Sequence, residues 1–342
     1  MNAIGLAKYA GALAALAICS ACGTLAVAPT NSALSGTYVG RTLIVNGRPV
    51  TAARLSTSPL PRYATILPDF HRKPRTHEYI INDYGSYAAI FNYPKSDNQI
   101  GQINGAGGQG CTNVLFGYGK KIFWNVGGPT QITEYRVPQR PIKTLTVNYH
   151  FPSSCAMNTS GDLAVGILYA TSSYTGGGEV VIFKNATGTP KVYKTPLDQE
   201  FFDGYDGQGN LFADGFTGNR SGFALVELPK GAKKFVTIST SNAVGFPGSV
   251  QWDGTYLTVV DQNAAAMYQY TVSGTKATLK GTVSLTGSGD CAQTWIGKGL
   301  VFCADAGNTD GEVYKYPAGG SALAVLGSGL PLPLGTTAAD KY

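Results

Sequence analysis

The chain has 342 residues and a net charge of +6; only 13% of its residues are charged, whereas 45 are glycine and 20 are tyrosine. This composition is typical of a turn-rich β-protein and excludes a disordered or coiled-coil chain. Lys and Arg are scattered apart from a short group at residues 72–75, so the sequence lacks the basic stripe with which proteins follow nucleic-acid phosphates. We therefore expect little helix and no nucleic-acid partner.

Residues 1–22 are predicted to be a secretory signal. Lys8 follows a short polar start, and the run from Tyr9 to Ile18 is almost wholly apolar. A helix that spans a membrane needs about 20 apolar residues, so this run is too short to be one. The chain is therefore expected to be exported.

Cys22 is the candidate site of lipidation. Together with the preceding Ser20-Ala21 it resembles the cleavage box of bacterial lipoproteins, in which the cysteine becomes the acylated N-terminus. Cys19 departs from that box, because Leu, Val or Ile usually stands there. The resemblance implies a protein anchored in the cell envelope, periplasmic or at the cell surface, which touches the membrane only through its lipid. Cleavage after Ala26 or Ala28, giving a secreted protein, is the alternative.

Residues 23–60 are rich in Ser, Thr, Pro, Ala and Gly and have weak periodicity. Such a segment is typical of a flexible tether. We predict one strand within it, at Thr42 to Val45.

The rest of the chain is repetitive. Five stretches share a six-residue step that ends in glycine, and these glycines are 44, 48, 45 and 43 residues apart. A short apolar run, a turn and a second run rich in Val, Tyr and Phe follow each one. All-strand repeats of 40 to 50 residues indicate the blades of a β-propeller. The five stretches are Cys111 to Gly117, Cys155 to Gly161, Asp203 to Gly209, Gly248 to Gly254 and Cys291 to Gly297.

We predict an all-β fold in which residues 61–342 form one β-propeller of six four-stranded blades, with five or seven blades as alternatives. Because an unclosed ring exposes strand edges, we expect closure by Tyr63 to Leu67 or by residues after Leu330. The strands expected in the first blade are Tyr79 to Asn82, Ala88 to Tyr93 and Ile100 to Ile103. Those expected in the third are Cys155 to Thr159, Leu163 to Ala170, Glu179 to Lys184 and Pro190 to Lys194.

The stretch Asp203 to Asp214, which reads Asp-Gly-Tyr-Asp-Gly-Gln-Gly-Asn-Leu-Phe-Ala-Asp, resembles the unit of NHL-type repeats. Short motifs of this kind extend over about 250 residues. The chain is thus similar to exported bacterial six-bladed β-propeller proteins. That resemblance implies a fold and a scaffold role, and it implies no activity.

Four cysteines remain after the signal: Cys111, Cys155, Cys291 and Cys303. An even number in an exported chain predicts two disulfides. Cys291 and Cys303 lie six residues either side of Gly297, which would place them opposite each other in a hairpin. Cys111 and Cys155 occupy the same repeat position in consecutive blades, on neighbouring inner strands. Buried free thiols or zinc ligands are the alternative.

The candidate binding face is a ring of acids and amides. In a blade the start of the first strand and the end of the second meet on one face, so oxygens from several blades could surround a cation such as Ca²⁺. The alternative is that these side chains stabilise tight turns, in which case no cofactor is needed. The ring consists of Asp83, Asn125, Asp203, Asp214, Asp261, Asp290 and Asp305.

The sequence contains no recognisable nucleophile, phosphate-loop or metalloprotease motif. We expect a monomeric, non-catalytic scaffold that binds a protein or a glycan. The alternative is a lactone hydrolase or lyase that uses a divalent cation at the mouth of the propeller channel. That chemistry needs a Glu beside the cation, and the repeat pattern predicts no Glu on an inner strand.

Overall fold

The computed structural model describes residues 36–39, 42–45, 48–51, 77–83, 87–104, 109–111, 122–126, 131–136, 140–147, 152–171, 177–219, 221–297 and 299–339. The chain divides into two compact units, Met1–Leu60 and Pro61–Tyr342. Within the described residues no helix is long and apolar enough to cross a membrane.

The first unit contains a three-stranded antiparallel sheet in the segment predicted to be a tether. Its strands are β1 (Gly36–Val39), β2 (Thr42–Val45) and β3 (Arg48–Thr51). β2 is the predicted strand, whereas β1 and β3 beside it were not predicted; that residues 23–60 form a tether stays a prediction. The missed signal is the Asn-Gly pair at residues 46–47, the dipeptide most typical of a tight hairpin.

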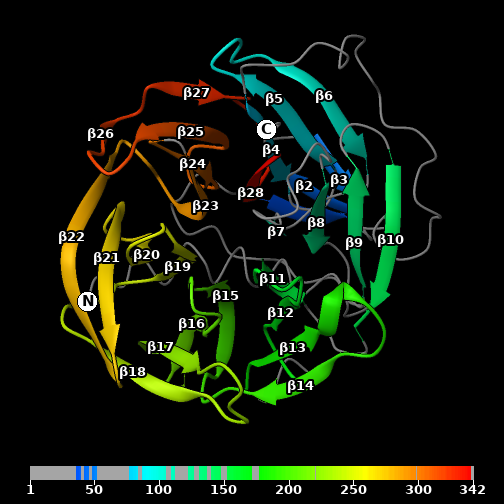
Figure 1. The fold of residues 1–342 in the computed structure, drawn as a ribbon. Coiled ribbons are helices and arrows are strands. Elements are labelled where there is room, and N and C mark those ends of the chain that lie inside the picture. The colour runs from blue at the N-terminus through cyan, green and yellow to red at the C-terminus, as the bar shows by residue number, and fades with distance from the viewer. Residues whose placement is uncertain are drawn as a thin grey trace. The chain divides into compact units, whose positions relative to one another are not determined.

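The described strands of the second unit fall into six groups of four antiparallel strands around a common centre, which makes this unit a β-propeller (Figure 1). We number the groups as blades 1 to 6 and give each from the inside outward. Blade 1 is β28 (Pro333–Ala339), β4 (His77–Asp83), β5 (Tyr87–Tyr93) and β6 (Gln99–Asn104). Blade 2 is β7 (Gln109–Cys111), β8 (Ile122–Val126), β9 (Gln131–Arg136) and β10 (Arg140–Thr146). Blade 3 is β11 (Pro152–Met157), β12 (Leu163–Ile167), β13 (Glu179–Phe183) and β14 (Lys191–Lys194).

The remaining blades follow the same order. Blade 4 is β15 (Gln199–Tyr205), β16 (Leu211–Thr217), β17 (Gly222–Leu228) and β18 (Val236–Thr240). Blade 5 is β19 (Pro247–Trp252), β20 (Leu257–Asp261), β21 (Ala266–Ser273) and β22 (Lys276–Thr286). Blade 6 is β23 (Cys291–Gly297), β24 (Leu300–Asp305), β25 (Asp310–Lys315) and β27 (Ala324–Leu326), while β26 (Gly320–Ser321) pairs with β22.

The ring is closed by the C-terminal strand. β28 pairs antiparallel with β4, so the innermost strand of blade 1 comes from the opposite end of the propeller sequence. The inner strands then contact one another in a cycle, from β7 through β11, β15, β19, β23 and β28 back to β7. Of the two predicted closing segments, residues after Leu330 are the ones that pair; Tyr63 to Leu67 lies outside the described residues.

The inner strands begin earlier than predicted. β11 begins at Pro152 rather than at Cys155, and β15 at Gln199 rather than at Asp203. In each, a β-bulge separates the first residues from the rest, so the strand bends where the repeat pattern starts. A proline marks the position before the bulge in three blades. These are Pro152, Pro247 and Pro333.

The hydrophobic core lies between neighbouring blades. Leu163 and Val165 of blade 3 pack against Ile132 of blade 2, and Phe302 of blade 6 packs with Phe91 of blade 1. Between blades 4 and 5 three phenylalanine rings meet edge to face, with centroids 5.1 to 5.9 Å apart. Each blade therefore buries both faces, which explains why its strands are apolar over several consecutive residues. The three rings are Phe201, Phe216 and Phe246.

A disulfide joins Cys291 to Cys303, as predicted, with their Cα atoms 5.6 Å apart. The two residues are not directly opposite, however, because the bulge in β23 pairs Cys291 with Asp305 and Thr294 with Cys303. Cys155 is also disulfide-bonded. The side chain of Cys111 lies outside the described residues, so its pairing with Cys155 remains a prediction.

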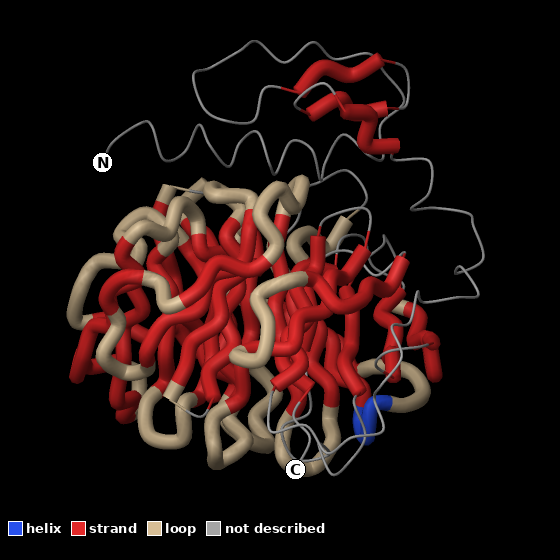
Figure 2. The backbone as a smooth tube through the Cα atoms, turned by 90° about the horizontal axis from the view of Figure 1, so that it is seen from above, coloured by secondary structure: helices blue, strands red, loops and turns tan. Residues whose placement is uncertain are grey.

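The strands of the propeller run between two rims of loops (Figure 2). The turns between inner and second strands lie at one rim, which we call the inner-turn face. Examples are the turns at Asn158–Gly161 and Asp206–Gly209, each closed by a backbone hydrogen bond. Turns between second and third strands, such as the one around Gly218 and Asn219, lie at the opposite face.

Deleting residues 333–342 removes β28 and leaves β4 without its inner neighbour. We expect this variant to lose the cooperative thermal transition and to form oligomers, because unpaired strand edges pair with other chains. Melting followed by circular dichroism and light scattering on a sizing column measure both effects. Deletion of 340–342 alone leaves β28 whole and is the control; a long deletion that behaves like the short one would contradict closure by β28.

Candidate functional site

The candidate site is a cavity of about 390 Å³ on the axis of the propeller, at the inner-turn face. Residues of β11, β15, β19, β23 and β28 line it, and the turns after the first three of these strands form its mouth. The lining includes Cys155, Met157, Asn158, Asp203, Tyr205, Asp206, Val250, Gln251, Trp252, Asp253, Gln293, Thr294, Trp295, Thr336 and Thr337.

Two acids at the mouth act as turn residues. Asp206 Oδ1 accepts hydrogen bonds from the backbone N–H groups of Gln208 and Asn210, both at 2.8 Å. Asp253 Oδ1 accepts from the N–H groups of Thr255 and Tyr256, at 2.7 and 2.6 Å. These bonds hold the turns that shape the opening.

Four deeper residues behave differently. Asp203, Thr294, Thr336 and Thr337 are 6, 5, 2 and 1% exposed, and their side-chain oxygens have no hydrogen-bond partner within the described part of the chain. The Ser154 hydroxyl lies close enough to Asp203 to lower its pKa, but its hydrogen bond of 3.2 Å is to the carboxylate of another residue. Buried polar groups are normally hydrogen-bonded, so four such residues around one cavity are an unusual concentration.

That other carboxylate belongs to Glu200, on β15 next to the cavity wall. It accepts hydrogen bonds from Ser153 Oγ at 2.5 Å and Ser154 Oγ at 3.2 Å. Two glycines make room for it: a Cβ on Gly166 would lie 2.0 Å from Glu200 Oε2, and one on Gly178 would lie 2.6 Å from Glu200 Cβ. The expectation that no Glu occupies an inner strand is therefore wrong, although Glu200 faces blade 3 and does not line the cavity.

Burial raises the pKa values of all three acids in this region. For Glu200, loss of hydration raises the pKa well above its usual range, and the neighbouring Asp203 raises it further. Burial raises the pKa of Asp203 to about 7. It also raises the pKa of Asp214, on β16, despite the nearby N–H groups of Gly248 and Phe202. Among the described residues no positive charge compensates these carboxyls, so each favours its protonated form.

Asp261 and Asp305 of the predicted acid ring hold loops together and are not among the residues that line the cavity. Asp305 is fully buried and accepts six hydrogen bonds from five residues, which tie the loop before β23 to the loop after β24. Asp261 does the same one blade earlier, with four N–H donors at 2.7 to 3.2 Å. Both are turn residues, as the alternative prediction has it. The donors to Asp305 are Ser288, Gly289, Asp290, Gly307 and Asn308.

The other members of the ring are placed separately. Asp214 lies opposite Phe202 of β15. Asp261 and Asp305 lie one position further along their own strands, and the residue of blade 4 at that position is Gly215. Asp290 lies in the loop that Asp305 holds. Asp83 and Asn125 belong to β4 and β8, and their side chains lie outside the described residues. Of the ring members whose side chains the structure describes, only Asp203 is among the residues that line the cavity.

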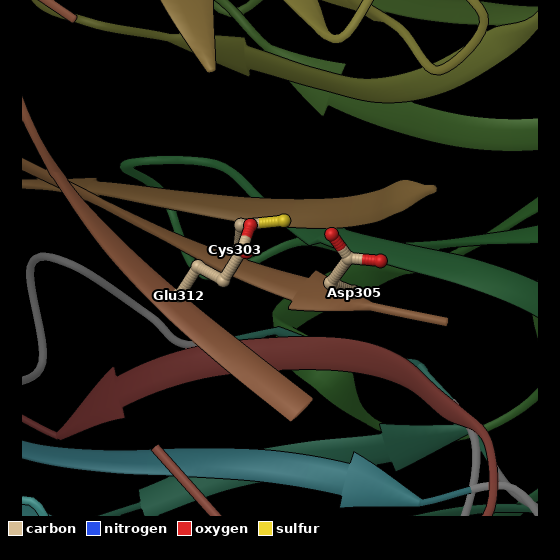
Figure 3. A group of neighbouring side chains, drawn as sticks. All are labelled: Cys303, Asp305 and Glu312. Atoms are coloured by element: carbon tan, nitrogen blue, oxygen red, sulfur yellow. The ribbon is translucent and has the colours of Figure 1, made fainter. Parts of the chain in front are cut away.

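Cys303, Asp305 and Glu312 form a second cluster, with ligand atoms within 4.8 Å of one another (Figure 3). The sulfur of Cys303 is already bonded to Cys291, and the Asp305 carboxylate holds its loops. Burial raises the pKa of Glu312 to about 7, and Glu312 accepts hydrogen bonds from Tyr314 and from Asn308. Because the Cys303 sulfur is in a disulfide and the Asp305 carboxylate is hydrogen-bonded to its loops, this cluster stabilises blade 6.

The sequence missed the threonines of the cavity. Thr336 and Thr337 belong to the closing strand, which lacks the glycine step of the other blades. The signal that could have found them is Pro333, which matches the prolines before the bulges of β11 and β19.

Replacing Asp305 with Ala removes the acceptor for several buried N–H groups. We expect the free energy of unfolding to fall by about 3 kcal/mol or more, because each buried donor left unpaired costs about 1–3 kcal/mol. Asp310→Ala is the matched control: this acid lies on the partner strand, opposite Asp305, and its buried Oδ1 has no partner in the described residues. Urea unfolding measures both variants, and an equal loss in both would contradict the role of Asp305.

Replacing Asp203 with Asn should stabilise the protein at alkaline pH. Folded Asp203 keeps its proton up to about pH 7, whereas unfolded Asp loses it near 3.8. Between these values the folded state binds more protons, so stability falls as the pH rises. We expect Asp203→Asn to match the wild type at pH 4 and to exceed it by up to about 4 kcal/mol at pH 8. Urea unfolding in EDTA checks this; a less stable variant at pH 8 would show that the carboxylate has a stabilising partner.

Comparison with known proteins gives the fold alone. No protein-family model and no curated protein matches the sequence. A solved structure described as a nidogen/laminin complex is similar to 77% of this chain, over 98% of its own chain, with a TM-score of 0.55 and 12% sequence identity. At that identity the similarity shows that both chains are β-propellers.

Proposed function

We propose that the protein is an exported binding module, anchored by a lipid on Cys22, that presents the inner-turn face of its propeller to a protein partner. The carrying observation is that turns of three consecutive blades meet around one cavity. Their tips are exposed, while the strands beneath them are buried and tied into the ring. Loops on a rigid scaffold are a common basis of recognition.

The structural comparison supports this proposal only in general terms. The similar propeller comes from a complex of two proteins, so the fold is one that serves protein–protein binding elsewhere. The composition of the cavity mouth fits the same role. It combines the half-buried Trp252 and Tyr205 with amide and carboxylate groups, and aromatic residues are enriched where proteins bind one another.

The arrangement of Glu200 weighs against a metal-dependent hydrolase. The carboxylate is fully buried against Gly166, its two hydroxyl donors come from β11, and it is not one of the described residues that line the cavity. A cation in the cavity would therefore lack the Glu that this chemistry needs.

Site-specific photo-crosslinking tests the binding face. A photoreactive phenylalanine is placed at Ser160, Gln208 or Thr255, all exposed turn residues of the inner-turn face, in the cells that make the protein. Asn219 and Asn308, exposed at the opposite face, are the controls. We expect adducts of defined mass from the first set only. Adducts that glycosidase but not protease removes would assign a glycan partner, and equal adducts from both sets would contradict the proposed face.

Two cysteine variants test the anchor. We expect Cys22→Ala to move the protein from the membrane fraction to the soluble fraction, because no acylated N-terminus can form. Cys19→Ala is the control, since that residue is removed with the signal. Intact-mass measurement of the mature chain shows the added lipid directly. An unmodified chain that begins after Ala26 or Ala28 would contradict lipidation without touching the proposed binding face.

A further inference from the structure

A second hollow, which we call the blade 4–5 groove, lies beside the axial cavity on the inner-turn face. Its volume is about 490 Å³, within the range of about 300–1,000 Å³ that is typical of binding pockets. Asp206 and Trp252 line both the groove and the axial cavity, so the two hollows are neighbours. All lining residues of the groove belong to blades 4 and 5. They include Phe212, Glu227, Val236, Thr255, Leu257 and Val272.

Glu227 of β17 is directed at this groove. Its neighbours Val226 and Leu228 pack with residues of blade 3, and successive residues of a strand point to opposite faces, so Glu227 faces blade 5. The strand pairing agrees, because residues opposite one another in an antiparallel sheet share a face. Glu227 lies opposite Phe212 and Val236, and both of these also line the groove.

The Glu227 side chain is buried and unpaired. It is only 8% exposed, yet no group in the described part of the chain donates a hydrogen bond to its carboxylate or forms an ion pair with it. Unlike the oxygens of Asp203 and Asp214, those of Glu227 are not sealed from solvent, so a ligand in the groove can reach them. Buried polar groups normally have a partner, and Glu227 lacks one within the described chain.

The charge of the groove selects a cationic group. Glu227 and Asp206 line it, whereas none of its described lining residues is Lys, Arg or His. Burial raises the pKa of Glu227 and Asp206 raises it further, while no described Lys or Arg lies close enough to lower it. Asp206 already holds its own turn, so Glu227 is the carboxylate that can form an ion pair with a ligand.

The form of the groove favours a guanidinium over an ammonium group. Both oxygens of Glu227 are unpaired, so they can accept the two parallel N–H groups of an arginine. A guanidinium is also more weakly hydrated than an ammonium and loses less on entering a partly closed site. The half-buried Trp252 lies against the blade 4 turn, where a Cβ on Gly207 would lie 3.1 Å from Trp252 Nε1. Aromatic rings attract guanidinium groups, and the apolar Val236 and Val272 suit an alkyl stem.

We propose that the blade 4–5 groove receives an arginine side chain of the protein partner, with the guanidinium on the carboxylate of Glu227 and the stem along Trp252 and Val272. This inference rests on the proposed function and deepens it, because it names the side chain that the partner inserts into the inner-turn face. The groove can nevertheless be tested without the partner, since an arginine side chain alone carries the recognised chemistry.

The test is a magnetic-resonance titration of the purified protein with isotope-labelled tryptophan, whose three indole N–H signals are assigned with Trp→Phe variants. The probes are Nα-acetyl-arginine methylamide and its lysine and citrulline counterparts; citrulline has the shape of arginine without the charge. We expect the arginine probe to shift the Trp252 signal to saturation, the lysine probe to bind more weakly and the citrulline probe to have no effect. No saturable shift with arginine, or an equal shift with citrulline, would overturn the proposal, and equal affinity for lysine would overturn the assignment to arginine.

A matched pair of variants assigns the carboxylate. Glu227→Gln keeps the shape and loses no hydrogen bond within the described chain, so we expect its melting temperature to be at least that of the wild type. Its affinity for the arginine probe should fall about tenfold or more. Glu179→Gln is the control: Glu179 is also a buried acid on the third strand of its blade, but it lies opposite Lys194 and does not line the groove. Equal affinity in the two variants would overturn the role of Glu227.

Photo-crosslinking in cells separates this inference from the proposed function. With the photoreactive residue at Ser160, which does not line the groove, Glu227→Gln should reduce the yield of adduct several-fold and Glu179→Gln should not. An unchanged yield in Glu227→Gln would leave the binding face intact and overturn the groove as the arginine site. No adduct at any inner-turn position would contradict the proposed function instead, and the titration would then decide the groove alone.

Discussion

The antiparallel pairing of β28 with β4 is the constraint on which the rest of the propeller depends. Each blade is apolar on both faces and can bury them only between two neighbours. A row of such blades would leave one apolar face exposed at each end, so the last blade must pack against the first. The strand that closes the ring also supplies Thr336 and Thr337 to the lining of the axial cavity. The lining of the cavity is therefore complete only when β28 has closed the ring.

The inner wall of blade 4 combines features that oppose stability. Glu200, Asp203 and Asp214 are buried without a positive partner in the described part of the chain, and glycines at positions 166 and 178 are needed to admit Glu200. Apolar residues would fill the same space at lower cost. Blades 3, 5 and 6 form the same four-stranded sheet with other residues at the corresponding positions, so the fold does not require these acids.

The regular part of the fold could be predicted because one physical need recurs in each blade. The turn between inner and second strand uses a glycine at positive φ, as at Gly161, Gly209 and Gly254, and this residue leaves a visible spacing. The cavity left no such signal. The bulges in the inner strands of blades 1 and 3 to 6 change which residues lie at equivalent positions, so the repeat spacing alone did not find Glu200 and misplaced Asp214. Asp261 looked like a ligand because turn residues and metal ligands share the same chemistry.

The chain order of the strands bears on when the protein can act. The inner strand of the first blade comes from residues 333–339, whereas its partner comes from residues 77–83. Pairs so distant in sequence form slowly and late. A chain that leaves the ribosome N-terminus first can complete neither its first blade nor its axial cavity until residues 333–339 have emerged. The arrangement therefore delays closure of the ring until late in synthesis.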